Sequence, residues 1–135
     1  MTTNKKGGFP PKLFRLIDAN LNRLREGIRV VEDIQRYIYD NKELSKKLKS
    51  LRHKCRLDDE KNLLEYRDIL GDVLKQTTKS EQKREDIPSI MIANIKRAEE
   101  SARVLEESLK LIDSNKAETF KQIRYELYNI EKFLS

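Results

Sequence analysis

The stretch DANLNRLREGIRVVEDIQRYI, from Asp18 to Ile38, has the apolar spacing of one long amphipathic helix, and it returns later in the chain. Its counterpart, IANIKRAEESARVLEESLKLI from Ile92 to Ile112, follows at a spacing of 74 residues. Seven of the fourteen positions from 19 to 32 carry the same residue in both segments: Ala19/Ala93, Asn20/Asn94, Arg23/Arg97, Glu26/Glu100, Arg29/Arg103, Val30/Val104 and Glu32/Glu106. We therefore interpret the chain as a duplicated unit.

The composition favours a helical domain with one core. The chain has 135 residues, of which 39% are charged and 37% apolar, and it has no Trp. Long amphipathic helices suit this balance because each buries a narrow apolar stripe and exposes the rest. Three Pro and four Gly are too few turn residues for a protein of many strands.

The apolar spacing predicts four main helices separated by short polar breaks. The first should begin between Leu13 and Asp18 and end near Tyr39, and the third should begin at Asp86, where Pro88 suits a first helical turn. The other predicted boundaries are a turn and cap at 40–41, with Glu43 placed for a capping box behind Asp40, a break at 57–59, a short helix at 63–64 and a break at 113–115.

We predict an all-α, antiparallel helical bundle built from two helix pairs related by a pseudo-twofold axis. Where the first helix has Leu24 and Ile28, the third has Ala98 and Ala102, and Gly27 is slim enough for a close crossing. The predicted domains are a flexible tail at 1–12 and one helical domain at 13–135, with repeat one at about 14–66, a loop at 67–86 and repeat two at about 87–134.

Several classes of site are absent from the sequence. Cys55 is the only cysteine, which excludes a disulfide framework, and its place in an apolar stripe favours a buried thiol over a nucleophile. His53, the only histidine, is interpreted as a packing or surface residue. No phosphate-binding glycine loop, zinc spacing or nucleophile elbow occurs. No apolar run is long enough for a membrane span and no signal-peptide pattern is present, so we expect a cytoplasmic protein.

The repeated polar residues leave two interpretations open. Asn20 and Asn94 fall inside the apolar arcs of their helices, where a buried amide needs a partner. One alternative is a structural clamp, with Asn20 bonding the opposite helix and Arg23 bonding Glu106. The other is a pair of ligand-facing clusters, in which Arg23 and Arg97 bind phosphate through their planar forks. If the first helix begins at Asp18, its free N–H groups would lie beside Asn20 and Arg23.

Arg29, Arg103 and the central loop leave similar alternatives. Arg29 and Arg103 suit either surface ion pairs or phosphate binding. Asp68 and Asp72, four residues apart around Gly71, suit either a hydrated Mg²⁺ or an ordinary polar turn. The basic candidates in the loop are Arg67, Lys79, Lys83 and Arg84.

Five runs together are similar to a small all-helical domain of bacterial thiamin biosynthesis. That domain is often fused in front of thiamin-phosphate synthase, and stand-alone copies carry the label thiamin-phosphate pyrophosphorylase-like. The resemblance covers nearly everything from Phe14 to Lys132, in the runs FRLIDANLNRLREGIRVVEDIQRYI, LKSLRHK, YRDILGDV, KREDIPSIMIANIKRAEESARVLEE and IRYELYNIEK.

The resemblance implies a kinase that phosphorylates hydroxymethylpyrimidine phosphate to the diphosphate, with ATP and Mg²⁺. Arg67 and Asp72 are the candidate catalytic residues, and Asp68 and Asp72 are the candidate Mg²⁺ ligands. The candidates for binding substrate or phosphate are Asn20, Arg23, Arg29, Arg67, Arg84, Asn94, Arg97 and Arg103. The pair Asp18 and Ile92 breaks the repeat, which favours the first helix as the one that carries the working site.

Two rival functions remain. A non-catalytic docking or regulatory module for thiamin-phosphate synthase predicts an exposed apolar patch and no nucleotide affinity. A nucleic-acid binder would account for the net charge of +6, but acidic residues alternate with the basic ones, which argues against it. A phosphorylated small molecule is the expected ligand, no membrane association is expected, and a homo-oligomer is left open.

Overall fold

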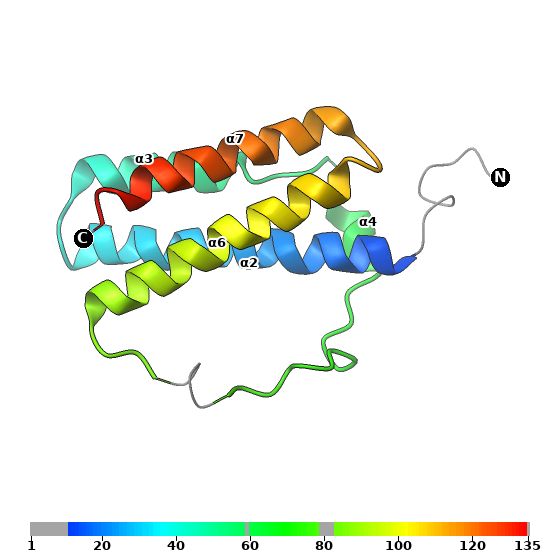
Figure 1. Ribbon diagram of the computed structural model, residues 1–135, viewed down its shortest axis with the longest axis horizontal. Coiled ribbons are helices and arrows are strands. Elements are labelled where there is room, and N and C mark those ends of the chain that lie inside the picture. The colour runs from blue at the N-terminus through cyan, green and yellow to red at the C-terminus, as the bar shows by residue number, and fades with distance from the viewer. Residues whose placement is uncertain (1–10, 59, 79–82, 135) are drawn as a thin grey trace.

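The predicted all-helical fold is confirmed. The computed structural model describes residues 11–58, 60–78 and 83–134, which contain five helices and no strand. The helices are α2 (Pro11–Tyr37), α3 (Lys42–Lys54), α4 (Glu60–Leu64), α6 (Ile87–Leu109) and α7 (Ser114–Glu131). α3 runs back along α2 and α7 runs back along α6, and the two hairpins meet through α2 and α6, which run in opposite directions (Figure 1).

The centre of the bundle is a close crossing of α2 and α6. Leu24 and Ile28 of α2 are fully buried in the same core cluster as Ala98 and Ala102 of α6. A Cβ atom added to Gly27 would lie 2.8 Å from the carbonyl oxygen of Asn94 and 3.3 Å from the Ala98 Cβ. The predicted packing of large against small side chains is therefore present, and the two backbones approach each other directly at Gly27.

The start of the first helix differs from the prediction. α2 begins at Pro11, because proline is tolerated in a first turn, where its missing N–H would have no helical partner. Pro11 and Lys12 are thus helical and not part of a tail, while residues 1–10 lie outside the described part of the chain. Asn20 and Arg23 lie more than two turns inside the helix. The expectation that free N–H groups of the first turn lie beside them is wrong.

The other helix starts are set by capping side chains. α3 is capped by Asn41, whose side chain accepts a hydrogen bond from Leu44 N at 3.0 Å, and not by Asp40 as predicted. Asp40 has a φ of 51°, a left-handed conformation that turns the chain just before the cap. The predicted start at Asp86 is correct, since its carboxylate caps α6. The break predicted at 113–115 is shorter than expected, because Asp113 caps α7 and Ser114 is already helical.

One ion pair ties each short helix to its long neighbour. Arg52 of α3 binds Glu32 of α2 at 2.7 Å, and Arg124 of α7 binds Glu106 of α6 at 3.0 Å. Both glutamates are buried, and they occupy corresponding positions of the two matched segments. The predicted clamp between Arg23 and Glu106 is wrong because Arg124 occupies that carboxylate.

The connection between the two hairpins is long and largely irregular. After α4, no helix forms in residues 65–78 or 83–86. Cys55, at the end of α3, is fully buried, and burial raises the pKa of its thiol to about 12. A thiol with that pKa stays protonated at neutral pH, which supports its interpretation as a core residue. No helix in the described segments is both long and apolar enough to cross a bilayer.

Candidate functional site

A groove of about 380 Å³ lies between α2 and α6. The two matched segments supply it with the same three residue types, one asparagine, one arginine and one glutamate each. Its lining consists of Asn20, Arg23, Glu26, Gly27, Asn94, Arg97, Glu100, Ser101 and Val104. The structure thus brings together four of the residues predicted to bind ligand, two from each helix.

The two asparagines of the groove make the same local hydrogen bond. Asn20 Nδ2 donates to the carbonyl oxygen of Leu16 at 3.0 Å, and Asn94 Nδ2 donates to that of Ile90 at 2.8 Å. A carbonyl can only accept, so the amide nitrogen of each side chain must face its own helix. Neither side-chain oxygen accepts a hydrogen bond from the described residues. The predicted bond from Asn20 to the opposite helix is therefore absent.

The charged residues of the groove have no partners in the described part of the protein. Arg23, Arg97, Glu26 and Glu100 are all exposed, and none of them forms an ion pair or hydrogen bond with a described residue. Two guanidinium groups and two carboxylates leave the groove with no net formal charge. A ligand that carries both an anionic group and hydrogen-bond donors would match this lining better than a simple anion.

A second and larger hollow, of about 540 Å³, adjoins the groove on the α2 side. It shares Asn20, Arg23 and Glu26 with the groove, so Arg23 borders both spaces. The remaining lining residues come from the first turns of α2 and from the loop, namely Lys12, Arg15, Leu16, Asp18, Ala19, Asn22, Arg67, Asp68, Ile69 and Asp72. We call this space the loop cleft.

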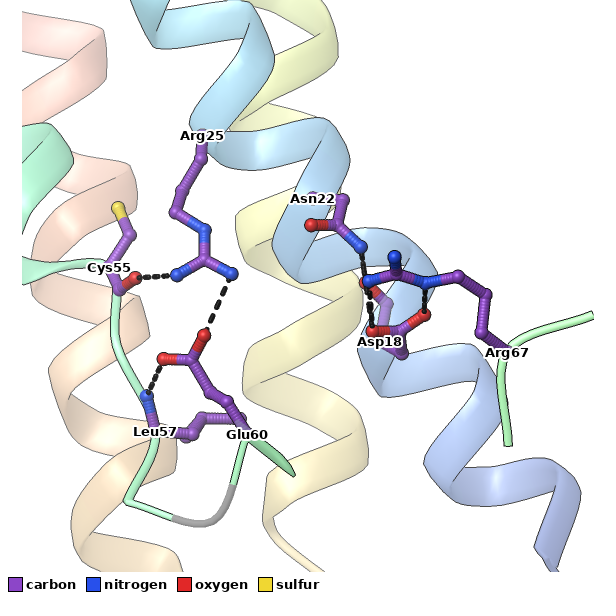
Figure 2. Close-up of polar contacts among 7 residues, drawn as sticks. All are labelled: Asp18, Asn22, Arg25, Cys55, Leu57, Glu60 and Arg67. Atoms are coloured by element: carbon purple, nitrogen blue, oxygen red, sulfur yellow. Dashed lines mark hydrogen bonds and ion pairs between the residues drawn. The ribbon is translucent and has the colours of Figure 1, made fainter. Parts of the chain in front are cut away.

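The loop is held against α2 by Asp18. Figure 2 shows Arg67 reaching from the loop to Asp18, and its Nε and one terminal nitrogen lie 2.8 and 2.9 Å from the carboxylate oxygens. This two-fold bond raises the pKa of the Arg67 guanidinium above its ordinary value. Arg15 also donates to the carbonyl oxygen of Asp68 at 2.9 Å. Arg67, predicted to bind phosphate, thus has two of its three nitrogens committed to anchoring the loop.

A similar anchor lies further along α2. Arg25 donates to the carbonyl oxygen of Cys55 at 3.3 Å and pairs with Glu60 of α4 at 2.9 Å (Figure 2). Glu60 in turn accepts a hydrogen bond from Leu57 N at 3.0 Å. α2 therefore organises both connecting segments, the turn into α4 and the loop after it.

The two candidate metal ligands lie together in the loop cleft. One carboxylate oxygen of Asp68 accepts from Gly71 N at 2.8 Å, and one of Asp72 accepts from Leu74 N at 2.9 Å. A Cβ atom at Gly71 would collide with the Asp68 carboxylate, so glycine lets this turn close tightly. Among the described residues, no group of three or more His, Cys, Asp or Glu could hold a metal ion. A Mg²⁺ ion there would need water or ligand phosphate as further ligands.

Three predicted phosphate ligands lie away from both spaces. Arg29 pairs with Asp33 at 3.3 Å and Arg103 with Glu107 at 3.6 Å, each across one helical turn on an exposed face. These local pairs agree with the alternative interpretation, in which the two arginines form surface ion pairs. Arg84 lies at the end of the loop and borders neither the groove nor the loop cleft. Lys79, also named from the sequence, lies outside the described residues.

Some residues of the site were not predicted. Lys12 and Arg15 line the loop cleft, but the sequence placed Lys12 in a tail and gave Arg15 no role. No local signal marked them, because their position depends on where the loop returns to α2. The ion pairs of Arg52 and Arg124 could have been found, since aligning the repeats matches the two arginines with each other and Glu32 with Glu106.

Comparisons with known proteins identify the family of the chain. The model of the ThiD2 family matches residues 15–133. This chain belongs to the ThiD2 family. It is also similar to thiamine-phosphate synthases: 40% identical over 126 residues to that of Synechocystis sp., covering 93% of this chain and 37% of the relative, and 36% identical over 121 residues to that of Rhodopirellula baltica, covering 86% and 32%.

The relatives are much longer than this ThiD2 protein. The chain spans little more than a third of their length, 37% in Synechocystis sp. and 35% in Nostoc punctiforme, whose synthase is 39% identical over 123 residues and covers 90% of this chain. No solved structure matches the chain significantly. The expected relationship to a helical domain of thiamin biosynthesis is confirmed, and the reaction itself is a separate question.

Proposed function

We propose that this protein is a kinase of thiamin biosynthesis that phosphorylates hydroxymethylpyrimidine phosphate to the diphosphate. The observation that carries the proposal is the pair Arg23 and Arg97, which border one groove from two helices and have no partner among the described residues. Family membership and the similarity to thiamine-phosphate synthases support the pathway, because a synthase that joins the pyrimidine to the thiazole needs the pyrimidine as its diphosphate.

The two adjoining spaces suggest how the substrate would lie. The groove between α2 and α6 has free carboxylates at Glu26 and Glu100, which disfavour a phosphate and suit a ring with donor groups. The loop cleft offers Lys12 and Arg15 beside Arg23. We therefore assign the pyrimidine to the groove and the phosphates to the loop cleft, with Arg23 between them.

The loop cleft fits a magnesium ion in its donor chemistry. Once Arg67 neutralises Asp18, the remaining charged residues are balanced, with Lys12, Arg15 and Arg23 against Glu26, Asp68 and Asp72. A polyphosphate would be repelled by Asp68 and Asp72 without a cation between them, and these carboxylates are the residues that would hold it. Bound Mg²⁺ would supply neutralisation of the phosphate charge.

The residues would act mainly by positioning. In the transfer, a phosphate oxygen of the substrate forms a bond to the terminal phosphorus of ATP, and the bond from that phosphorus to the ADP oxygen breaks. Arg23, which borders both spaces, would hold phosphate oxygens through paired donors. Arg97, which borders only the groove, would donate to the pyrimidine and orient it. Arg67 would act through the loop, since its bond to Asp18 sets the position of Asp68 and Asp72.

The test is a coupled assay with the purified protein, hydroxymethylpyrimidine phosphate, ATP and Mg²⁺, followed by thiamin-phosphate synthase and the thiazole phosphate. We expect thiamin phosphate only when this protein is present. A folded protein that yields none would overturn the proposal.

Matched arginine variants identify the site in the same assay. Arg23→Ala should lower kcat/KM by about 100-fold, the usual scale for removing one group that stabilises transition-state charge. Arg97→Ala should lower kcat/KM as well, mainly through a higher KM, because it removes a contact to the ring in the groove. Arg29→Ala and Arg103→Ala are the controls, since they remove the same side chain one or two turns away on an exposed face. Equal effects at all four positions would remove the groove from the proposal.

One observation favours the docking module as a second candidate. Four aliphatic side chains of the loop, Ile69, Leu70, Val73 and Leu74, are 67, 84, 94 and 84% exposed. Exposed apolar residues of this density suit contact with another protein. A protein without nucleotide affinity that binds thiamin-phosphate synthase, and loses this binding when the four residues become serine, would establish that function instead.

A further inference from the structure

The asparagines of the groove present oxygens, not nitrogens, to a ligand. We propose that Asn20 and Asn94 select the substrate by accepting hydrogen bonds from N–H donors on its ring edge, and that they do not contact phosphate. The inference rests on the proposed function for the identity of the ring, and it adds the atoms that recognise it.

The direction of the two amides follows from their local bonds. Asn20 Nδ2 and Asn94 Nδ2 donate to backbone carbonyls one turn earlier, at 3.0 and 2.8 Å. Reversing either amide would place its oxygen against that carbonyl oxygen, which is repulsive. Each side chain is therefore held with Nδ2 on its own helix, and both residues line the same groove.

The oxygen atoms have no partner within the described residues, although the Asn20 side chain is almost buried. Only 4% of Asn20 is exposed, and no described residue donates to its oxygen or to that of Asn94. Neither oxygen is among the fully covered side-chain atoms that lack a partner, so both are open to the groove. A ligand that fills the groove covers these oxygens, and covering them without a donor costs free energy. The same amide orientation occurs on both helices, so it is not a peculiarity of one side chain.

The surroundings of these oxygens favour a neutral donor over an anion, because Glu26 and Glu100 offset the charges of Arg23 and Arg97 in the same groove. Glu26 and Glu100 lie on the same groove with no ion pair among the described residues. Phosphate oxygens are acceptors at neutral pH, so they would meet two amide oxygens and two carboxylates without a shared proton. An exocyclic amino group has two donors and no charge, and the aminopyrimidine of the proposed substrate carries one. The groove thus suits an aminopyrimidine edge.

The decisive experiment measures binding of two ligands to wild-type protein by calorimetry. One is hydroxymethylpyrimidine phosphate, and the other is the same molecule with its exocyclic amino group replaced by hydrogen. The wild type should bind the amino compound about tenfold more tightly or better, because the second ligand covers the two acceptors without pairing them. Asn20→Ala and Asn94→Ala should each reduce this ratio towards one, while the affinity for the second ligand changes little.

Asn129→Ala is the matched control, since Asn129 is an exposed asparagine of α7 away from the groove, and its ratio should stay at the wild-type value. The ratio of the two affinities is measured on one protein, so partial unfolding of a variant affects both affinities equally and cancels. A circular-dichroism melt reports the folded fraction of each variant. An unchanged ratio in both groove variants would overturn the inference. Wild-type protein that binds neither ligand would overturn the proposed function as well.

Discussion

The two halves of this protein make the same polar contacts along the middle of their long helices and differ in one residue near one end. In both long helices, an asparagine bonds the backbone one turn earlier, and a buried glutamate binds an arginine of the following helix. At the position two residues before the asparagine, α2 has Asp18 and α6 has Ile92. Asp18 is buried under Arg67, whereas Ile92 is 36% exposed.

This difference gives a nearly symmetric groove different surroundings on its two sides. The loop that leads from α4 to α6 can pack on only one of the two halves, and the carboxylate of Asp18 gives it an anchor on α2. The loop cleft therefore extends the groove on that side, with Asp68 and Asp72 on its wall. The prediction that the α2 half carries the working site accords with this geometry and is open to the tests below.

The strongest test of the similarity between the two halves is to remove the buried glutamates of the two ion pairs. Glu106→Ala and Glu32→Ala should each lower the free energy of unfolding by about 3 kcal/mol, because each leaves a covered arginine without its partner. Glu106→Ala should cost more, since the side chain of Arg124 is 9% exposed and that of Arg52 is 18% exposed. Urea unfolding measures both, and a loss at one position only would show that the pairs are not equivalent.

A methyl group at the helix crossing should break the packing in one half only. Gly27→Ala places a Cβ atom 2.8 Å from the backbone oxygen of Asn94, and overpacking of this kind costs about 1–3 kcal/mol, more than the helix propensity that alanine gains. Ser101 is its counterpart, and Ser101→Ala makes the side chain smaller, so we expect little change. Thermal unfolding of the two variants gives the comparison, and equal stability would contradict the close approach.

A pH series should separate two matched positions that differ in charge. Arg25 pairs with Glu60, whereas its counterpart Glu99 is buried, and burial together with a hydrogen bond to Glu131 raises the pKa of Glu99 to about 8. The folded state then binds this proton more tightly than the unfolded state, so the contribution is full below about pH 4.5 and is lost as the pH rises towards 8.

Glu99→Gln tests this pH dependence, because glutamine resembles the protonated acid. Over that interval the wild type should lose more than about 1 kcal/mol of stability relative to the variant, because one pKa unit is worth about 1.4 kcal/mol and the rise exceeds one unit. Thermal midpoints at both ends of the interval measure the difference. A constant difference between the two proteins would show that Glu99 is ionised throughout.

The smallest effect on stability, and the most local one, is expected at Asp18. Asp18→Asn should cost only a few tenths of a kcal/mol, because Arg67 is 39% exposed and partly solvated pairs contribute little. It should nevertheless speed amide hydrogen exchange in residues 67–78 and raise the KM for the phosphorylated substrate. Ile92→Asn is the matched control and should change neither. A loop that exchanges at the wild-type rate in Asp18→Asn would mean that Arg67 does not anchor it.

Much of the fold was predictable because it depends on spacing and capping. The apolar stripes of α2 and α6, the caps at Asp86 and Asp113 and the close crossing at Gly27 all follow from residues near in sequence or matched by the repeat. The start of α2 was not predictable, since Pro11 could equally begin a helix or lie in an extended tail. The cap of α3 was misplaced by one residue because Asp40 and Asn41 are both good capping residues.

The candidate site was predictable in its residues but not in its arrangement. The repeat singled out Asn20, Arg23, Asn94 and Arg97, which line one groove. It singled out Arg29 and Arg103 equally, and these lie on exposed faces with local ion pairs. A three-residue step turns each side chain only part of the way around the helix, so identity alone cannot tell which members face the neighbouring helix.

The sequence by itself determined the helices, their pairing and the two sets of polar residues, because helical periodicity and capping are local and the repeat made each of them appear twice. Only the tertiary structure decided that the two asparagines present oxygens to a common groove, and that Asp18 holds the loop through Arg67. Both depend on contacts between segments far apart in the chain. Those contacts arise when the helices pack, and no local pattern records them.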